Sequence, residues 1–153
     1  MKSIMEAEKE NFARQPREEK VMIDASEIFY PELNQKIRNL VREGYKEIEL
    51  KNVNGQRYLG TGLMEKKLKI SIYGTPGNDL AAFMDGATIE VFGNAQDAVA
   101  NTMNAGKVII HGHAGDVLGY GMRGGRLHIL GNVGYRVGIH MKAFRDHRPV
   151  VIA

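Results

Sequence analysis

A histidine pair in the glycine-rich part of the chain is the first candidate for chemistry. His111 and His113 flank one glycine, and imidazole nitrogens are common zinc ligands. A zinc site needs three or four converging ligands with supporting neighbours. The pattern of this region recurs every 19 positions, and the equivalent positions in neighbouring repeats hold phenylalanine, leucine and asparagine. We therefore expect no metal site and interpret both histidines as surface turn residues.

Two aspartates are the second candidate. Asp97 and Asp116 are one repeat apart, so they would stack one above the other, and like-charge repulsion could prepare one of them for acid–base catalysis. Asn78 occupies the same column, and the other interpretation is a ladder of turn residues whose side chains bond back to local backbone. The chain has no cysteine, and no Ser/His/Asp order stands out. We expect the ladder and no catalytic residue.

A third pattern resembles a nucleotide-binding loop. Gly119, Gly121 and Gly124 match the spacing G-x-G-x-x-G. The dinucleotide fingerprint requires a strand before the loop and a helix after it, within a βαβ unit of ~30 residues. Here the alternating apolar pattern of a strand follows, at residues 127–130. We therefore assign these glycines to turns and expect no cofactor-binding residue.

Several columns of residues recur every 19 positions, and this repeat determines which elements must position the candidate residues. The repeated glycines are Gly74, Gly93, Gly112 and Gly131. The repeated apolar residues are Met84, Met103, Met122 and Met141, together with the alternating pairs Ile70/Ile72, Ile89/Val91, Val108/Ile110 and Leu127/Ile129. Small residues recur at Ala81, Ala100, Gly119 and Gly138. Because independent columns share one period, chance is a poor explanation for them.

A unit of this length is too short for a helix pair or a propeller blade, and it suits one coil of a solenoid. The alternating pairs would place two side chains of each coil on one strand face, stacked over those of the coil below at ~4.8 Å. Sharp corners favour glycine, through positive φ or close approach of the backbone. The usual crossover chirality favours a right-handed winding. The predicted fold is all-β, a single-stranded right-handed parallel β-helix with about five coils.

The segment before the repeat has a different composition. Residues 1–20 carry ten charged side chains and no apolar period, so we interpret them as a charged arm that need not be ordered. The apolar residues of 31–43 form one helical stripe, which predicts a capping α-helix at the start of a β-helix domain covering 21–153. A small insertion is expected around 65–67, and 150–152 should begin a further strand.

Charge and hydropathy disfavour several partner classes. The formal net charge is +3, with basic and acidic residues interleaved over most of the chain, whereas nucleic-acid binding favours a one-signed patch with aromatic platforms. No apolar run approaches the ~18 residues of a membrane span, and the charged start lacks the apolar region of a signal peptide. We expect a cytoplasmic protein with no nucleic-acid or membrane partner.

Three segments resemble the C-terminal glycine-repeat domain of the large subunit of glutamate synthase. They are Asn52–Gly60, Gly93–Asp97 and Gly112–Gly125. The resemblance covers roughly residues 21–149 and is closest to the type in which this domain is a separate chain. The β-helix subunit of formylmethanofuran dehydrogenase is similar over Gly106–Met141, and the helix region favours glutamate synthase.

The resemblance implies a structural function. In glutamate synthase, an amidotransferase domain hydrolyses glutamine, and ammonia moves to a flavin domain that makes glutamate from 2-oxoglutarate. The β-helix packs beside both and carries no catalytic group. We therefore expect a non-enzymatic subunit or domain whose partners are the catalytic domains, with FMN and the iron–sulfur cluster bound there. The alternatives are a β-helix of the formylmethanofuran dehydrogenase type and an independent ligand-binding β-helix that uses the polar turn column. A homo-oligomer is compatible with each of them.

Overall fold

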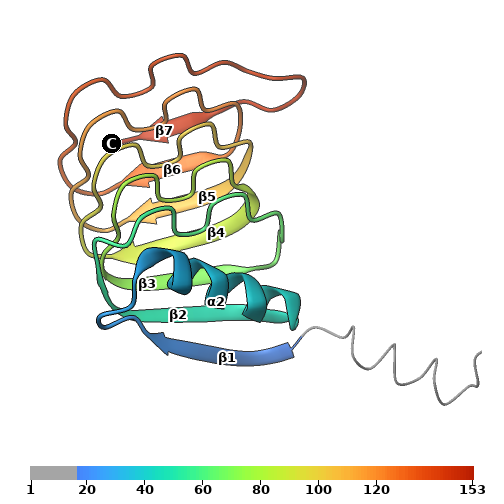
Figure 1. Cartoon of the computed structure of the whole chain (residues 1–153). Coiled ribbons are helices and arrows are strands. Elements are labelled where there is room, and N and C mark those ends of the chain that lie inside the picture. Colours follow the sequence, from blue (N-terminus) through green and yellow to red (C-terminus); the bar gives the residue numbers. More distant parts are fainter. Residues whose placement is uncertain (1–16) are drawn as a thin grey trace, which may run out of the picture.

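The computed structural model describes residues 17–153, which form one parallel sheet, the turns that close each coil, and one helix (Figure 1). The seven strands lie in sequence order, and every neighbouring pair is parallel. The elements are β1 (Arg17–Asp24), α2 (Tyr30–Arg42), β2 (Tyr45–Asn54), β3 (Lys69–Thr75), β4 (Asp85–Phe92), β5 (Ala105–Ile110), β6 (Arg126–Ile129) and β7 (Val150–Ile152). The predicted fold class, an all-β parallel solenoid with one helix, is confirmed.

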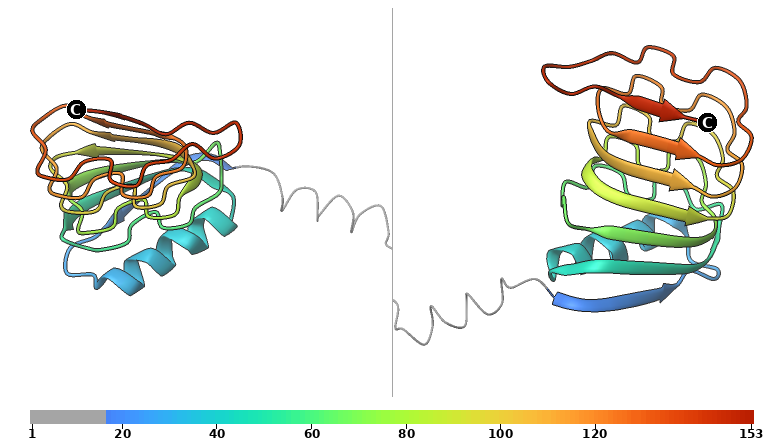
Figure 2. Two further views of the ribbon diagram at one scale, coloured as in Figure 1. Left: turned by 90° about the horizontal axis from the view of Figure 1, so that it is seen from above. Right: turned by 180° about the vertical axis from the view of Figure 1, so that it is seen from behind.

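The coils wind in the right-handed sense. All strands run the same way along the back of the molecule in Figure 1, and the chain returns across the front before it enters the next strand above. Figure 2 shows the sheet on one side of the solenoid and the turns on the other. In the first coil α2 takes the place of the turns between β1 and β2, so the helix covers the base of the solenoid.

The strand register confirms the predicted interior columns. Val108 pairs with Ile89 on one side and with Leu127 on the other, and the column two residues further along pairs in the same way. The six predicted residues of β4, β5 and β6 are all at most 3% exposed. Each coil therefore buries its branched side chains against those of its neighbours, which gives a single repeat a core that it could not form alone.

The methionine column is confirmed for three of its four members. Met84, Met103 and Met122 are fully buried, whereas Met141 is partly buried. Flexible thioethers suit this position because they fill irregular space between the strands and the turns. Met141 lies in the last described coil, which no further described coil covers, and this explains its exposure.

Strand β1 was not predicted, and it begins at Arg17, inside the predicted charged arm and before the predicted start of the β-helix domain at 21. Arg17–Lys20 form the last four residues of the predicted arm, and they belong to β1 and pair with β2. The rest of the predicted arm, 1–16, lies outside the described residues. The Lys20 ammonium contacts the carboxylates of Glu49 at 3.1 Å and Glu47 at 3.8 Å. An edge strand can hold such charged residues because its stability comes from the backbone ladder, which is independent of apolar alternation.

Helix α2 agrees with the predicted helix to within one residue at each end. Pro31 lies in its first turn, where a missing amide proton costs nothing, and Gly44 follows its last turn with a φ of 97°. Leu33 and Ile37 are buried beneath the helix at the base of the core. Within the described residues, no helix is long and apolar enough to cross a membrane.

The predicted insertion is found between Leu63 and Leu68. The Asp85 amide bonds the carbonyl of Leu63, which lies 22 positions earlier, whereas the Thr88 amide bonds that of Leu68, which lies 20 positions earlier. The coil therefore accommodates two extra residues at this corner without disturbing the strands on either side. Val150–Ile152 pair with β6, as the sequence pattern predicted.

The buried columns predict that a charged side chain placed in them destabilises the fold. Val108→Asp should lower the free energy of unfolding by several kcal/mol, on the order of 3–5, because an unpaired carboxylate would be enclosed between Ile89 and Leu127. Lys107→Asp is the matched control, since this neighbouring side chain points to the exposed face. Urea unfolding followed by circular dichroism measures both variants. A Val108→Asp protein that unfolds at the parent's midpoint would show that the inward assignment is wrong.

Candidate functional site: the glycine and polar turn columns

The repeated glycines lie where the backbones of successive coils approach each other closely. The amide of Gly112 donates to the carbonyl of Gly93 at 2.9 Å, and the amide of Gly131 donates to that of Gly112 at 3.0 Å. A Cβ atom on Gly93 would overlap the carbonyl oxygen of Gly74 in the coil below. The predicted column therefore has a structural function. Gly74 and Gly93 also have positive φ, of 121° and 159°, whereas Gly112 and Gly131 do not, so close approach of the backbone is the reason that all four glycines share.

A second backbone pattern was not predicted from the sequence. Each of five successive coils holds three left-handed residues at alternate positions, with φ between 52° and 78°. Ten of the fifteen are not glycine, although this conformation costs an L-residue roughly 1–2 kcal/mol. The recurring small residues Ala81 and Ala100 were the available signal for it. The residues are Tyr58, Gly60, Gly62, Asp79, Ala81, Phe83, Ala98, Ala100, Thr102, Val117, Gly119, Gly121, Arg136, Gly138 and His140.

The left-handed residues connect each coil to both of its neighbours. In one coil, the amide of Ala98 donates to the coil above at 2.9 Å, that of Ala100 to the coil below at 2.8 Å, and that of Thr102 to the coil above at 2.7 Å. The coil starting at Val117 repeats this arrangement. Backbone donors that a turn would otherwise expose to solvent are thus used between coils, and this offsets the cost of the left-handed backbone.

The aspartate column is a ladder of side chain to backbone bonds. Asn78 Oδ1 accepts the amide of Asp97 at 3.1 Å, Asp97 Oδ1 accepts that of Asp116 at 2.7 Å, and Asp116 Oδ1 accepts that of Tyr135 at 2.8 Å. The predicted ladder is correct, but its partner is not: each side chain bonds the same turn of the next coil, 19 positions on, and not local backbone. A carboxylate oxygen used in this way is a structural acceptor.

The two candidate histidines do not share a site. His113 belongs to a second ladder, in which its backbone amide is bonded by Asn94 Oδ1 and its ring Nδ1 accepts the Asn132 amide, both at 2.8 Å. His111 lies on the outer face of the sheet, where its Nε2 is 2.8 Å from Glu90 Oε2. Within residues 17–153, no three histidine, aspartate or glutamate side chains are grouped closely enough to hold a metal ion.

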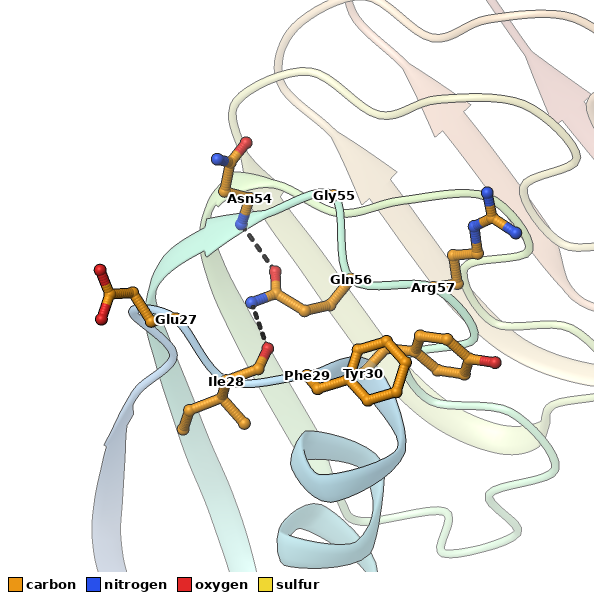
Figure 3. A pocket seen from close by; sticks show the side chains of 8 residues that line it. All are labelled: Glu27, Ile28, Phe29, Tyr30, Asn54, Gly55, Gln56 and Arg57. Atoms are coloured by element: carbon orange, nitrogen blue, oxygen red, sulfur yellow. Dashed lines mark hydrogen bonds between the residues drawn. The ribbon is translucent and has the colours of Figure 1, made fainter.

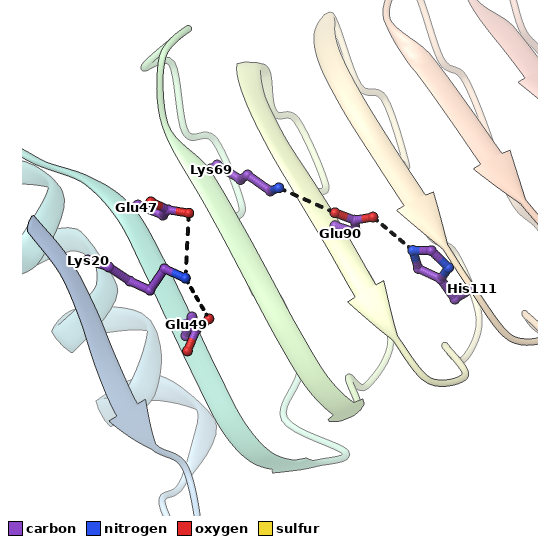
Figure 4. Close-up of polar contacts among 6 residues, drawn as sticks. All are labelled: Lys20, Glu47, Glu49, Lys69, Glu90 and His111. Carbon is purple, nitrogen blue, oxygen red and sulfur yellow. Dashed lines mark hydrogen bonds and ion pairs between the residues drawn. The ribbon is translucent and has the colours of Figure 1, made fainter. Parts of the chain in front are cut away.

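Charged and aromatic side chains form columns on the outer face of the sheet. Glu90 lies between Lys69, whose Nζ is 3.4 Å away, and His111 (Figure 4). The hydrogen bond from His111, with a smaller contribution from Lys69, lowers the pKa of Glu90 below its usual value. The rings of Tyr73, Phe92 and His111 stack at centroid distances of 4.9 and 4.7 Å. These contacts connect β3, β4 and β5.

An open pocket of about 550 Å³ lies between the start of α2 and the turn after β2 (Figure 3). Its buried polar residue is Gln56, whose amide nitrogen donates to the carbonyls of Ala25 and Ile28 at 3.0 and 3.1 Å. The side-chain oxygen of Gln56 accepts a hydrogen bond from the backbone amide of Asn54 at 2.7 Å. These bonds hold the β1–α2 loop against the solenoid, so Gln56 is committed to the fold.

The glycines of the G-x-G-x-x-G pattern lie in a solenoid turn. Gly119 and Gly121 have φ of 65° and 61°, and Gly124 occupies the corner before β6. A Cβ atom on Gly124 would overlap the carbonyl oxygen of Asn104 in the coil below. A strand follows the pattern where the dinucleotide fingerprint has a helix, so its structural context is absent at this position.

These features define a class of protein: a right-handed parallel β-helix whose glycine and polar columns connect one coil to the next. The chain belongs to the GXGXG motif family, whose model matches residues 19–152. An uncharacterized protein of Methanocaldococcus jannaschii is 52% identical over 73 residues, which cover 46% of this chain and 28% of that protein. No solved structure matches. Glycine at alternate positions is what a backbone with alternate left-handed residues favours.

The glycine column gives a second prediction. Gly131→Ala should destabilise the protein by about 1–3 kcal/mol, because its new methyl group would overlap the carbonyl oxygen of Gly112 in the coil below, and Gly131 has no positive φ that would add strain. Gly62→Ala is the matched control, since its Cβ would meet nothing within 4 Å and only its φ of 67° is unfavourable. Urea unfolding compares the two. Equal losses would mean that conformation, and not contact between coils, explains the column.

The outer face gives a pH prediction. The pKa of Glu90 is lower in the folded protein than its ordinary value of 4.5. The ionised carboxylate therefore stabilises the fold above pH 4.5, and this contribution is lost as the pH falls from 4.5 through the lowered pKa. The unfolding midpoint of the parent should therefore be higher than that of the Glu90→Gln variant at about pH 6. The difference between the two midpoints should shrink towards about pH 3. A difference between the midpoints that stays constant over this pH range would show that the ionised Glu90 carboxylate does not stabilise the fold.

Proposed function

We propose that this chain is a non-catalytic structural component of a glutamate synthase-type assembly. The GXGXG motif domain is found in glutamate synthase, and the family match that supports the proposal spans nearly all of the described solenoid. The module would support the amidotransferase and FMN domains that convert glutamine and 2-oxoglutarate into glutamate. FMN and the iron–sulfur cluster would bind to those domains.

The hydrogen-bond pattern supports this proposal. Asp97, Asp116 and His113 were candidates for a functional site because of their polar side chains. In the fold, a side-chain atom of each accepts a hydrogen bond from a backbone amide of the next coil. Donors in the turns bond to neighbouring coils as well. A surface whose polar groups are used by the fold is suited to holding a rigid shape for other domains, and it leaves few groups to bind a transition state.

The absence of activity can be tested on the isolated chain. We expect no release of ammonia from glutamine above a buffer blank and no saturable quenching of FMN fluorescence, because the chain has no cysteine nucleophile and residues 17–153 contain no phosphate-binding loop in a βαβ setting. A glutaminase and a flavodoxin serve as positive controls. Glutaminase activity or saturable FMN binding by this chain would favour the independent enzyme or ligand binder.

The structural function requires a partner test. The chain should be co-expressed with the amidotransferase and FMN-domain polypeptides of glutamate synthase from the same organism. Elution of all components in one complex during size-exclusion chromatography is the expected result, with glutamate synthesis lost when this chain is omitted. Separate elution, with full activity of the other polypeptides, would show that the chain has another function.

A further inference from the structure

Charge is distributed very unevenly along the chain. Residues 117–153 contain six lysine or arginine residues and one acidic residue, Asp146, whereas 1–116 contain fifteen and seventeen. The last described coils therefore carry a net charge of +5 while the rest carries −2. None of the six basic side chains forms an ion pair within the described residues. The six are Arg123, Arg126, Arg136, Lys142, Arg145 and Arg148.

Half of these basic residues lie on an insertion with a defined structure. Leu127 pairs with Val151, which lies 24 positions later, so this coil is five residues longer than the regular repeat. The extra length lies in residues 142–149, called the basic arm below, which extends beyond the coils beneath it (Figure 1). Backbone bonds of 3.1 and 3.0 Å, donated by Lys142 and Val150, anchor its two ends to the coil below. Residues 142–148 are all exposed.

The tip of the arm holds two arginines against one aromatic ring. Phe144 and His147 exchange backbone hydrogen bonds of 3.0 Å, which close the tip into a tight turn. The guanidinium groups of Arg123 and Arg145 lie 5.3 and 5.2 Å from the centre of the Phe144 ring. The Nε atom of Arg123 also donates a hydrogen bond to Asn104 Oδ1 at 3.0 Å. The ring therefore restricts both guanidinium groups before any partner binds.

We propose that the basic arm and the adjoining Arg123 and Arg126 are a docking surface for an acidic surface of a partner protein. Arginine forks bind carboxylates in bidentate geometry, and pre-ordered arginines beside an aromatic residue are typical of the centres of protein interfaces. Arg126 extends the surface, since it pairs with Val150 at the end of the arm. Nucleic acid fits less well because base stacking favours several aromatic platforms, whereas Phe144 is the one phenylalanine, tyrosine or tryptophan of the arm and two guanidinium groups already contact its ring.

This inference deepens the proposed function by naming the surface through which the module would bind, and its test is independent of glutamate synthesis. The probe is a fluorescein-labelled poly-L-glutamate of roughly 20 residues, and anisotropy is measured with the full chain at about 50 mM salt. An oligothymidylate of the same length and label is the second probe. Analytical ultracentrifugation records self-association of the same samples.

We expect the double variant Arg145→Glu/Arg148→Glu to weaken poly-glutamate binding by at least about tenfold. Phe144→Ala should also weaken it although no charge changes, which separates an ordered surface from general attraction. The control Lys66→Glu/Lys67→Glu makes the same change of net charge on an exposed corner elsewhere and should leave binding within about twofold. Circular dichroism confirms that each variant is folded.

Four results would overturn the proposal. They are no poly-glutamate binding by the parent, equal losses in the arm variant and its control, tighter binding of oligothymidylate, and self-association that the arm variant abolishes. The third result would identify a nucleic-acid surface and the fourth an interface between copies of this chain. If the arm binds as expected while the co-expression experiment fails, the proposed assembly is wrong and the docking surface stands.

Discussion

Each coil of this protein can satisfy its backbone only by bonding to the coils before and after it. On the sheet side the parallel ladder does this, and on the turn side the left-handed residues do it, as Ala98 and Ala100 illustrate by donating in opposite directions. Because the bonds join equivalent positions, every coil must keep the backbone conformation of its neighbours. This constraint accounts for the regular spacing of the columns.

The constraint acts differently on different columns. Where the backbones of successive coils approach closely, as at Gly93, any side chain meets backbone, so glycine is required. Where only the backbone conformation is unusual, as at Ala98 and Thr102, other residues occur, because bonds between coils offset the local cost. Polar columns such as Asp97 and Asp116 add acceptors at a third kind of position. The turn face is thus largely occupied by interactions that hold the solenoid together.

Some charged side chains on the surface contact one another within the fold, whereas others remain available to a partner. The charged residues of the central sheet, such as Lys69, Glu90 and His111, contact one another. The basic side chains of the last coils have no such acidic partners within the described residues, and the insertion at 142–149 carries three of them away from the stack. A repeat that is otherwise uniform thereby acquires one distinctive region, and departures from the period are where a scaffold can gain specificity.

The solenoid could be predicted from the sequence, because the fixed period of the columns and the alternation at Ile89 and Val91 are local consequences of stacking equivalent coils. It also indicated the α2 helix, the insertion around 65–67 and the strand at 150–152. The bonding partners of the turn residues could not be predicted in this way, because they depend on which coils lie next to each other after folding. Asp97 was expected to bond its own turn and instead bonds the next coil, and β1 begins among charged residues, because backbone pairing between coils determines both and leaves no apolar pattern in the sequence. The basic arm became visible as one surface only when folding brought Arg123 against Phe144.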